Sequence, residues 1–371
     1  MSAVALEETP SPATETGPGL RVMTSRRVAI ILFNLGGPDK QDAVRPFLFN
    51  LFNDKAIIGA PQPFRFFIAQ LISRSREKLA KANYALMGGG SPILPETVKQ
   101  ADALEAAIAK RVSNVTFKCF PAMRYWTPFV KDAAKAAEKW GATDAILLPL
   151  YPQFSSTTTG SSLAAWREAS RLPTSTICCY PAGAKFAQAH ADAILAKWRE
   201  GGSPARPRLL FSAHGLPQSV IARGDPYQWQ VEQSVAAVRK LLPSDWDIRT
   251  CYQSRVGPMK WIGPSTEEEI HRAGADKAGL IISPIAFVSE HVETLVELDI
   301  EYAQLAKRLQ LPFYLRAPSL GADPRFIDAL ADLTERALSA PGKVQGETGG
   351  RLCPAAHGLC AHGDVDLKGA R

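Results

Sequence analysis

Ionisable side chains gather where a buried strand gives way to a helix. The run Gly279 to Phe287 is almost wholly apolar, as expected of a strand in a parallel sheet, and Ser289-Glu290-His291-Val292-Glu293 follows it. In α/β proteins the carboxyl ends of such strands form the ligand-binding edge of the sheet. A second apolar run, 208 to 213, ends at His214, and the turn Gly215-Leu216-Pro217 exposes its imidazole. Both strands therefore bring groups that bind metal ions or protons to one edge.

An acidic row begins at this edge. The carboxylates stand three, four and four residues apart, at Glu290, Glu293, Glu297 and Glu301. On a helix this spacing puts them on one face. Most acidic helix faces are simply solvated, but clustered carboxylates repel one another unless a cation or protons neutralise them. Because the row starts at a ligand-binding edge, we expect it to conduct a divalent metal ion or protons.

Oxygen ligands with one or two imidazoles suit Fe²⁺ or Zn²⁺. The histidines His214 and His291 lack the spacing of a tightly closed zinc site, and no cysteine-rich motif stands beside them. The pattern therefore favours weak, open coordination, which a protein needs if it must pass the metal ion on.

Several motifs follow one another in a fixed order between about Ala29 and about Leu330. Besides the segment around Glu293, these are Phe33-Asn34-Leu35-Gly36-Gly37-Pro38, Tyr84-Ala85-Leu86-Met87-Gly88-Gly89-Gly90-Ser91-Pro92, Met123-Arg124-Tyr125, Tyr151-Pro152-Gln153-Phe154-Ser155 with Thr158-Thr159-Gly160-Ser161, Ser212-Ala213-His214-Gly215-Leu216-Pro217, and Gln253-Ser254-Arg255-Val256-Gly257-Pro258 with Trp261. With these motifs the sequence resembles the ferrochelatases, the enzymes that insert Fe²⁺ into a porphyrin at the end of haem synthesis.

The resemblance implies a lyase that inserts Fe²⁺ into protoporphyrin IX, releases two protons and uses no ATP. It also implies that His214 and Glu293 are both the catalytic pair and the metal ligands. A neutral imidazole accepts protons near physiological pH, so His214 is the expected base for the pyrrole protons. Glu290, Glu297 and Glu301 would relay metal ions or protons, while His291 would orient Glu293.

An apolar macrocycle needs apolar walls. Aromatic side chains in an α/β protein usually belong to the core, but those within the motifs are candidates for the substrate site. Tyr84, Arg124 and Trp261 match residues near the porphyrin site of the family, and Arg124, with Ser161, would meet a propionate through charge-assisted hydrogen bonds. The predicted substrate-binding residues are Leu35, Tyr84, Arg124, Tyr125, Trp261 and Phe287, with Met87 and Trp126 as further wall residues.

These groups need a scaffold of parallel strands. Apolar runs predict strands at 28–36, 115–122, 144–150, 175–181, 208–213, 247–253, 279–287 and 311–316, with amphipathic helices between most of them. The residues Gly141, Ala142, Ala145, Phe154 and Ser156 recur at identical offsets as Gly274, Ala275, Ala278, Phe287 and Ser289. We therefore expect an α/β fold of two similar Rossmann-like, chelatase-type halves. Each would be a four-stranded parallel sheet flanked by helices, with the ligand in the cleft between them.

This fold predicts the domain boundaries. Residues 1–25 are expected to be a disordered tail, 26–170 a first α/β domain and 171–322 a second one that carries the metal site. The segment 61–91, rich in Phe and Arg, would form a helical lip over the cleft. A helix at 323–340 would pack back onto the first domain, and the Gly-, Lys- and Glu-containing stretch after it predicts a flexible tail from 341 to 371.

Composition narrows the partners. The chain has 371 residues and a formal net charge of +7, but no basic run is interleaved with aromatics, so nucleic acid is not an expected partner. The glycine motifs lack the lysine and the third glycine of nucleotide-binding loops. No stretch approaches the ~20 apolar residues of a membrane span. We expect a cytoplasmic protein whose Phe- and Arg-rich lip contacts the inner face of the cytoplasmic membrane peripherally.

The six cysteines are too few for a disulfide framework in a chain of this length. Some ferrochelatases hold a [2Fe-2S] cluster with one internal and three C-terminal cysteines, but this chain has only Cys353 and Cys360 at its C-terminal end. A cluster here would also need His362 and one of Cys178 or Cys179. The alternative is a tail without a ligand. Neither reading makes a resident cofactor necessary for metal insertion.

Two other functions stay open. A chelatase for coproporphyrin III or a cobalt-accepting precursor would need more basic residues in its cleft to meet additional carboxylates. A non-catalytic haem or tetrapyrrole carrier could use His214 as an axial ligand. It would have no use for the carboxylates that follow Ser289.

Overall fold

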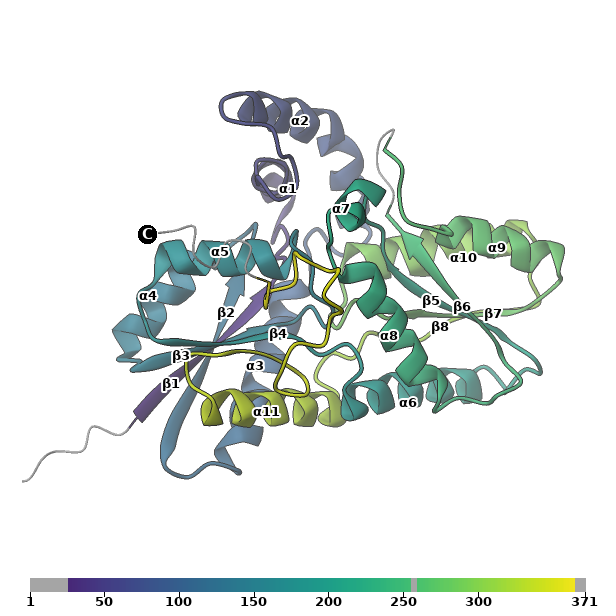
Figure 1. The fold of residues 1–371 in the computed structure, drawn as a ribbon. Helices are drawn as coiled ribbons and strands as arrows, with labels where there is room; N and C mark the ends of the chain where they lie inside the picture. Colours follow the sequence, from purple (N-terminus) through teal and green to yellow (C-terminus); the bar gives the residue numbers. More distant parts are fainter. Residues whose placement is uncertain (1–25, 255–258, 364–371) are drawn as a thin grey trace, which may run out of the picture.

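The computed structural model describes residues 26–254 and 259–363, which form two parallel sheets side by side, each flanked by helices (Figure 1). The first sheet has the order β2-β1-β3-β4-β9 and the second β6-β5-β7-β8. The strands are β1 Arg26–Asn34, β2 Val115–Met123, β3 Asp144–Pro149, β4 Thr174–Cys179, β5 Arg208–His214, β6 Asp247–Gln253, β7 Leu280–Pro284, β8 Tyr314–Arg316 and β9 Val344–Gly346. The predicted α/β architecture of two similar halves is confirmed.

The two halves share one topology. Each sheet starts with a central strand, β1 or β5; the next strand pairs on one side of it, and the third and fourth strands lie on the other side. Each therefore has a switch point between its first and third strands, where ligands bind in open α/β sheets. The internal echo in the sequence marks this repeat, since it spans α4 and β3 in one half and α9 and β7 in the other.

Helices cover both sheets. They are η1 Gln41–Ala43, α1 Val44–Phe52, α2 Phe64–Ala85, α3 Ile93–Ala109, α4 Val130–Trp140, α5 Thr159–Ala169, α6 Ala184–Glu200, α7 Gln218–Ala222, α8 Tyr227–Arg239, α9 Thr266–Ala275, η2 Glu293–Tyr302, α10 Ala303–Arg308 and α11 Pro324–Ser339. Local sequence sets several ends: Gly141 closes α4 in the left-handed conformation, and Ser265 with Glu268 forms a capping box on α9.

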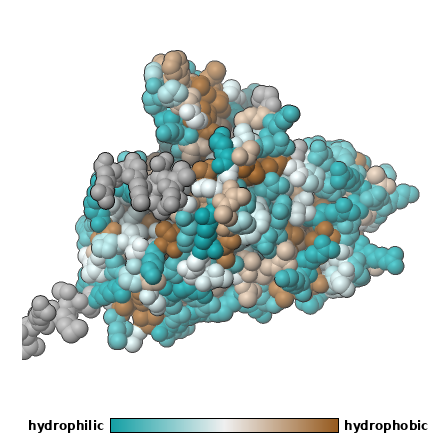
Figure 2. All heavy atoms as spheres, in the orientation of Figure 1, coloured by the Kyte–Doolittle hydropathy of each residue, from teal (hydrophilic) through white to brown (hydrophobic). Residues whose placement is uncertain are grey.

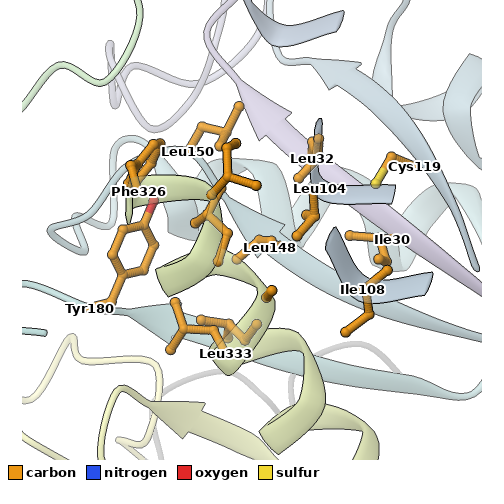
Figure 3. Close-up of a cluster of buried hydrophobic side chains, with 14 of the residues drawn as sticks. Ile30, Leu32, Leu104, Ile108, Cys119, Leu148, Leu150, Tyr180, Phe326 and Leu333 are labelled. Atoms are coloured by element: carbon orange, nitrogen blue, oxygen red, sulfur yellow. The ribbon is translucent and has the colours of Figure 1, made fainter. Parts of the chain in front are cut away.

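The first half has a core cluster on each face of its sheet, one against α3 and α11 and the other against α4 and α5. Leu104 and Ile108 of α3 pack with Ile30 of β1, while Phe326 and Leu333 of α11 belong to the same buried cluster (Figure 3). Helix α11 also contacts α6 and β4. The last long helix of the chain thus crosses back to the first sheet and fastens the second half to it.

Two segments differ from the expected boundaries. Strand β4 pairs with β3, so the first sheet continues past residue 170, and the crossover to the second half is α6. The stretch expected to begin a flexible tail contains β9, which pairs with β4, and Cys353 and Cys360 beyond it are buried. A strand of three residues is too short to show periodicity in a sequence, and the neighbouring strand supplies its hydrogen bonds.

The segment predicted as a lip is largely helix α2, which stands with α1 above the sheets (Figure 1). Its exposed apolar side chains include Phe64, Phe67 and Leu71, with 65–70% of their surface accessible. Figure 2 shows brown, apolar patches on this part of the molecule, with teal, hydrophilic residues beside them. Within residues 26–254 and 259–363, none of the helices combines the length and apolar character that a bilayer-spanning segment requires.

Candidate active site

A histidine and a glutamate meet where the second sheet reaches its switch point. His214 is the last residue of β5, and Glu293 is the first residue of η2, which follows the loop after β7. The Nδ1 atom of His214 lies 2.8 Å from Oε2 of Glu293. Strand β5 is buried along its length except at His214, so the fold brings this imidazole out of the core at the strand's end.

A polar network holds Glu293 in place. The Ser254 hydroxyl lies 3.2 Å from Oε2 of Glu293 and 2.6 Å from Oε2 of Glu297, so it bridges the two carboxylates. Gln253 donates to the Glu293 carbonyl and to the Glu297 carboxylate. Ser254 has a φ of 61°, a left-handed conformation that is unusual outside glycine and is common at functional sites. The network therefore connects Glu293 to the next carboxylate along η2.

His291 completes this group. Its Nδ1 lies 3.1 Å from the Ser289 carbonyl, which can only accept, so Nδ1 carries the proton and Nε2 of the neutral ring is an acceptor. That Nε2 lies 4.0 Å from Oε2 of Glu293. The Phe287 ring packs against both histidines, with centroid distances of 4.6 Å to His291 and 6.5 Å to His214. Nε2 of His291 and Oε2 of Glu293 are therefore two neighbouring acceptors, and a cation or a proton between them would be stabilised by both.

Inside the described ranges, no three His, Cys, Asp or Glu side chains are arranged to hold a metal ion on their own. His214 and Glu293 are therefore an open pair and not part of a closed metal site.

These groups lie at a cavity of about 190 Å³ between the two sheets. The second half contributes His214, His291, Glu293, Phe287 and Tyr227, among others. The first half contributes the opposing wall, which includes Asn34, Leu35, Leu51, Ile57, Tyr125, Leu150, Tyr151, Gln153 and Ser155. Of the predicted substrate residues, Leu35, Tyr125 and Phe287 line this cavity.

The other predicted substrate residues stand behind or beside these walls. Tyr84 is buried in the cluster of Tyr125 and Val44; burial raises the pKa of its phenol, and the charge of Glu293 adds to that effect. Trp261 lies beside α7, where its backbone pairs with Pro217. Neither lines the cavity within the described part of the chain, and residues 255–258 of the motif before Trp261 lie outside it.

Arg124 has a protein partner that the motifs did not indicate. Its guanidinium pairs with Asp54 at 2.8 Å and donates to the Ser161 hydroxyl at 2.6 Å. Tyr125 also donates to Asp54, at 2.8 Å. Asp54 follows α1 in a segment without a recognisable motif, so only its long-range contacts reveal it. The buried Asp54 therefore holds the arginine that was predicted to bind a propionate.

The four carboxylates of the acidic row lie in three places, and Glu293 alone of them lines the inner cavity. Glu297 and Glu301 line a second, outer cavity of about 790 Å³. Glu267, Glu268 and His271 of α9 line the same cavity. Glu290 lines neither cavity, because Arg316 and the Ser319 amide bind its carboxylate at 2.6 Å and 2.9 Å. The helix starts at Glu293, so the helical spacing that seemed to align Glu290 with the others does not apply to it.

The comparisons with known proteins now decide the family. Residues 27–338 match the Ferrochelatase family. The chain is 52% identical over 345 residues to a ferrochelatase of Hyphomonas neptunium, which covers 92% of this chain and 97% of that protein. It is 56% identical to a ferrochelatase of Phenylobacterium zucineum, over 90% of this chain and 98% of the relative, and 55% identical to one of Caulobacter vibrioides, over 91% and 100%.

The chain belongs to the ferrochelatase family. It is thus an enzyme of the chelatase type, and the resemblance predicted from the motifs is confirmed. The matched residues include both sheets apart from Arg26 and strand β9, and they include every cavity-lining residue named above.

In this member of the family, His214 and Glu293 form an ion pair. Burial lowers the pKa of His214, but the charge of Glu293 and the hydrogen bond to it outweigh burial and raise that pKa above its usual value. Burial raises the pKa of Glu293, yet the charge of His214 and its hydrogen bond lower it to about 2. The raised pKa of His214 stabilises the folded state below the unfolded value of about 6.5, and this contribution is lost as pH rises through the folded pKa.

We expect NMR titration of ¹³C-labelled histidines to show the His214 midpoint above 6.5 in the wild type. In Glu293→Gln the midpoint should fall, because burial then acts without the opposing carboxylate. His190 is an internal control, since burial alone lowers its pKa to about 3 and Glu293 does not contribute. An unchanged His214 midpoint in the variant would contradict the ion pair.

Proposed function

We propose that this enzyme inserts Fe²⁺ into protoporphyrin IX, with release of the two pyrrole protons and without ATP. The observation that carries the proposal is the His214–Glu293 pair at the floor of a mainly apolar cavity between two sheets. An apolar macrocycle can fill such a site, while the pair supplies a base and a carboxylate ligand at one point.

The pair must change charge during the reaction. Fe²⁺ approaching Glu293 would oppose the positive charge on the His214 imidazolium and favour loss of its proton. The neutral imidazole can then accept a proton from a pyrrole nitrogen. Nε2 of His291, an acceptor 4.0 Å from the same carboxylate, would help to hold the metal ion or the departing proton. His214 and Glu293 would thus give up their ion pair during the reaction. His214 would then contact the porphyrin, and Glu293 would contact the metal ion.

The cavity volume bears on how the macrocycle enters. Its 190 Å³ is below the ~300–1,000 Å³ of most ligand pockets, so the ring would extend beyond it. Ile57, which lines the cavity and is 39% exposed, lies in the loop between α1 and α2. We infer that the porphyrin enters on this side, beneath the helical lip, with Arg124 exchanging part of its contact with Asp54 for a propionate.

A separate route would serve the metal ion and the protons. Glu301 and Glu297 face the outer cavity, and the Ser254 hydroxyl connects Glu297 to Glu293. Burial raises the pKa of Glu301, and the charge of Glu297 adds to that effect, as expected of neighbouring carboxylates that share protons or a cation. This route would keep the metal ion and the protons apart from the apolar entrance that we propose for the porphyrin.

The lip would bring the porphyrin entrance to a lipid surface. Helix α2 combines exposed Phe64, Phe67 and Leu71 with five basic residues and a single acidic one, Glu77. An apolar face with basic residues around it suits peripheral binding to a membrane that contains anionic lipids.

The primary test is an optical assay of Fe²⁺ insertion into protoporphyrin IX. His214→Ala and Glu293→Ala should each lower turnover by about 100- to 10,000-fold, because positioned proton transfer is lost. His190→Ala is the control for removing a buried histidine remote from the cavity. Near-normal turnover of His214→Ala at saturating substrates, or faster insertion into coproporphyrin III than into protoporphyrin IX, would refute the proposal.

For the relay, Glu297→Gln and Glu301→Gln should raise the apparent KM for the metal ion by about 10-fold or more while leaving porphyrin binding unchanged. Glu290→Gln is the matched control: it should leave this KM near the wild-type value and lower thermal stability, because Arg316 loses a partner. A higher metal KM in Glu290→Gln alone would reverse the assignment.

For the membrane contact, the full chain should co-sediment with vesicles containing phosphatidylglycerol more than with pure phosphatidylcholine. Replacing Phe64, Phe67 and Leu71 with Ser should reduce the bound fraction several-fold, since their apolar contacts with lipid are lost. Leu241→Ser, at an exposed leucine after α8, should bind as the wild type does. Equal binding of both variants would exclude the lip as the contact surface.

A further inference from the structure

A glutamine of the first half holds the β7–η2 loop, residues 285–292, which carries His291 in the second half. Gln100 lies on α3, and its side chain is completely buried. Its Nε2 donates to the Val288 carbonyl at 3.1 Å and to the Gly321 carbonyl at 3.0 Å, and its Oε1 accepts from the Ser289 hydroxyl at 3.1 Å. These partners lie between 188 and 221 residues further along the chain. Gln100 therefore ties the loop to the other half of the molecule.

The three partners require an amide at this position. The carbonyls of Val288 and Gly321 can only accept, so they need the two N–H groups, and the amide oxygen is left for the Ser289 hydroxyl. A carboxylate would set an oxygen against two carbonyl oxygens, and an apolar side chain would leave buried polar atoms without a partner, which is costly. Each polar atom of Gln100 is thus used in fixing the loop.

The loop in turn fixes the ring of His291. Ser289, whose hydroxyl bonds to Gln100, accepts the Nδ1 proton of His291 through its backbone carbonyl at 3.1 Å. The position of this carbonyl decides which ring nitrogen carries the proton. Nε2 is left as an acceptor, 4.0 Å from Oε2 of Glu293. A chain of hydrogen bonds therefore runs from α3 of the first half to the acceptor beside Glu293.

Apolar packing anchors the loop in the same direction. Val288 is buried in the core cluster of the first half, together with Leu104 of α3 and Phe326 of α11. The loop thus leaves the second sheet and inserts a side chain into the core of the other half. Its course after β7 is set by α3 as well as by its own sheet.

Helix α3 also supports the porphyrin wall. Ile93 lines the inner cavity, and the Thr97 hydroxyl accepts from the side-chain amide of Asn34, another lining residue, at 3.0 Å. Residues 93, 97 and 100 stand four and three apart, so they share one face of the helix. One helix face therefore sets the position of the porphyrin wall relative to the loop that carries His291.

We propose that Gln100 is a positioning residue for metal insertion. It holds the backbone of Val288 and Ser289 so that the Ser289 carbonyl keeps Nε2 of His291 free and close to Glu293. Within the described residues Gln100 lines neither cavity, so it acts through the loop and touches neither substrate. This role rests on the proposed function, since Fe²⁺ insertion is the reaction for which the loop would be positioned.

The kinetic test uses the full chain and Gln100→Met, which removes three hydrogen bonds and nearly conserves volume. Its kcat for Fe²⁺ insertion into protoporphyrin IX should fall about 10-fold, as when groups behind a metal ligand are lost, while the KM for protoporphyrin stays near the wild-type value. Gln230→Met is the matched control: Gln230 is equally buried and accepts from the Phe154 amide of the first half, but it lies on α8 and makes no hydrogen bond to the loop. It should lower thermal stability and keep kcat.

The His291 tautomer gives a readout that needs no substrate. At about pH 8, where a buried imidazole is neutral, ¹⁵N spectra of histidine-labelled wild type should show His291 protonated at Nδ1. Gln100→Met should show both tautomers, and Gln230→Met only the first. Gln100→Glu is a second variant in case Gln100→Met does not fold. It keeps the size and the acceptor for Ser289 but offers the carbonyls at most one proton, so it should show a smaller change of the same kind.

An unchanged tautomer in both Gln100 variants, or an equal loss of kcat in Gln230→Met, would overturn the positioning role. A wild-type chain that inserts no Fe²⁺ would refute the proposed function instead, and the tautomer comparison would still decide whether Gln100 positions His291.

Discussion

The structure depends on one ion pair, between His214 at the end of β5 and Glu293 at the start of η2. Each charge is tolerable in its partly buried position only because the other is 2.8 Å away. The pair requires β5 and β7 to be neighbours, so that the loop after β7 returns to the end of β5. It also requires Ser254, whose left-handed backbone sets a hydroxyl between two carboxylates. The same pair would be broken when a metal ion arrives.

The repeated topology explains why the site is a cavity and not an open edge. Each half has a switch point between its first and third strands. The two halves face each other, so residues of the first half form the wall opposite His214, His291 and Glu293 of the second. Helix α11 maintains this arrangement, since it packs on α3 and α6. The inner cavity beneath the lip and the acidic cavity beside η2 lie on different elements, which would allow the two unlike substrates we propose to reach one point by separate routes.

Periodicity and motif order predicted both sheets, and the positions of His214 and Glu293 followed from strand ends alone. The errors have physical causes. Glu290 precedes the helix, and Arg316 of β8, 26 residues further along the chain, forms an ion pair with it. Strand β9 exists because β4 offers an unpaired edge, which no local pattern reveals. The contact of Arg124 with Asp54 joins a motif residue to one that lies in no motif, and only the folded chain brings them together.

The most direct test of the central claim is an anomalous difference map from crystals soaked with Co²⁺ as a stand-in for Fe²⁺. We expect a peak within coordination distance of both the His214 ring and the Glu293 carboxylate, and we expect Glu293→Ala crystals to lack it. A peak confined to the outer cavity beside Glu301, with the His214–Glu293 contact intact, would contradict it.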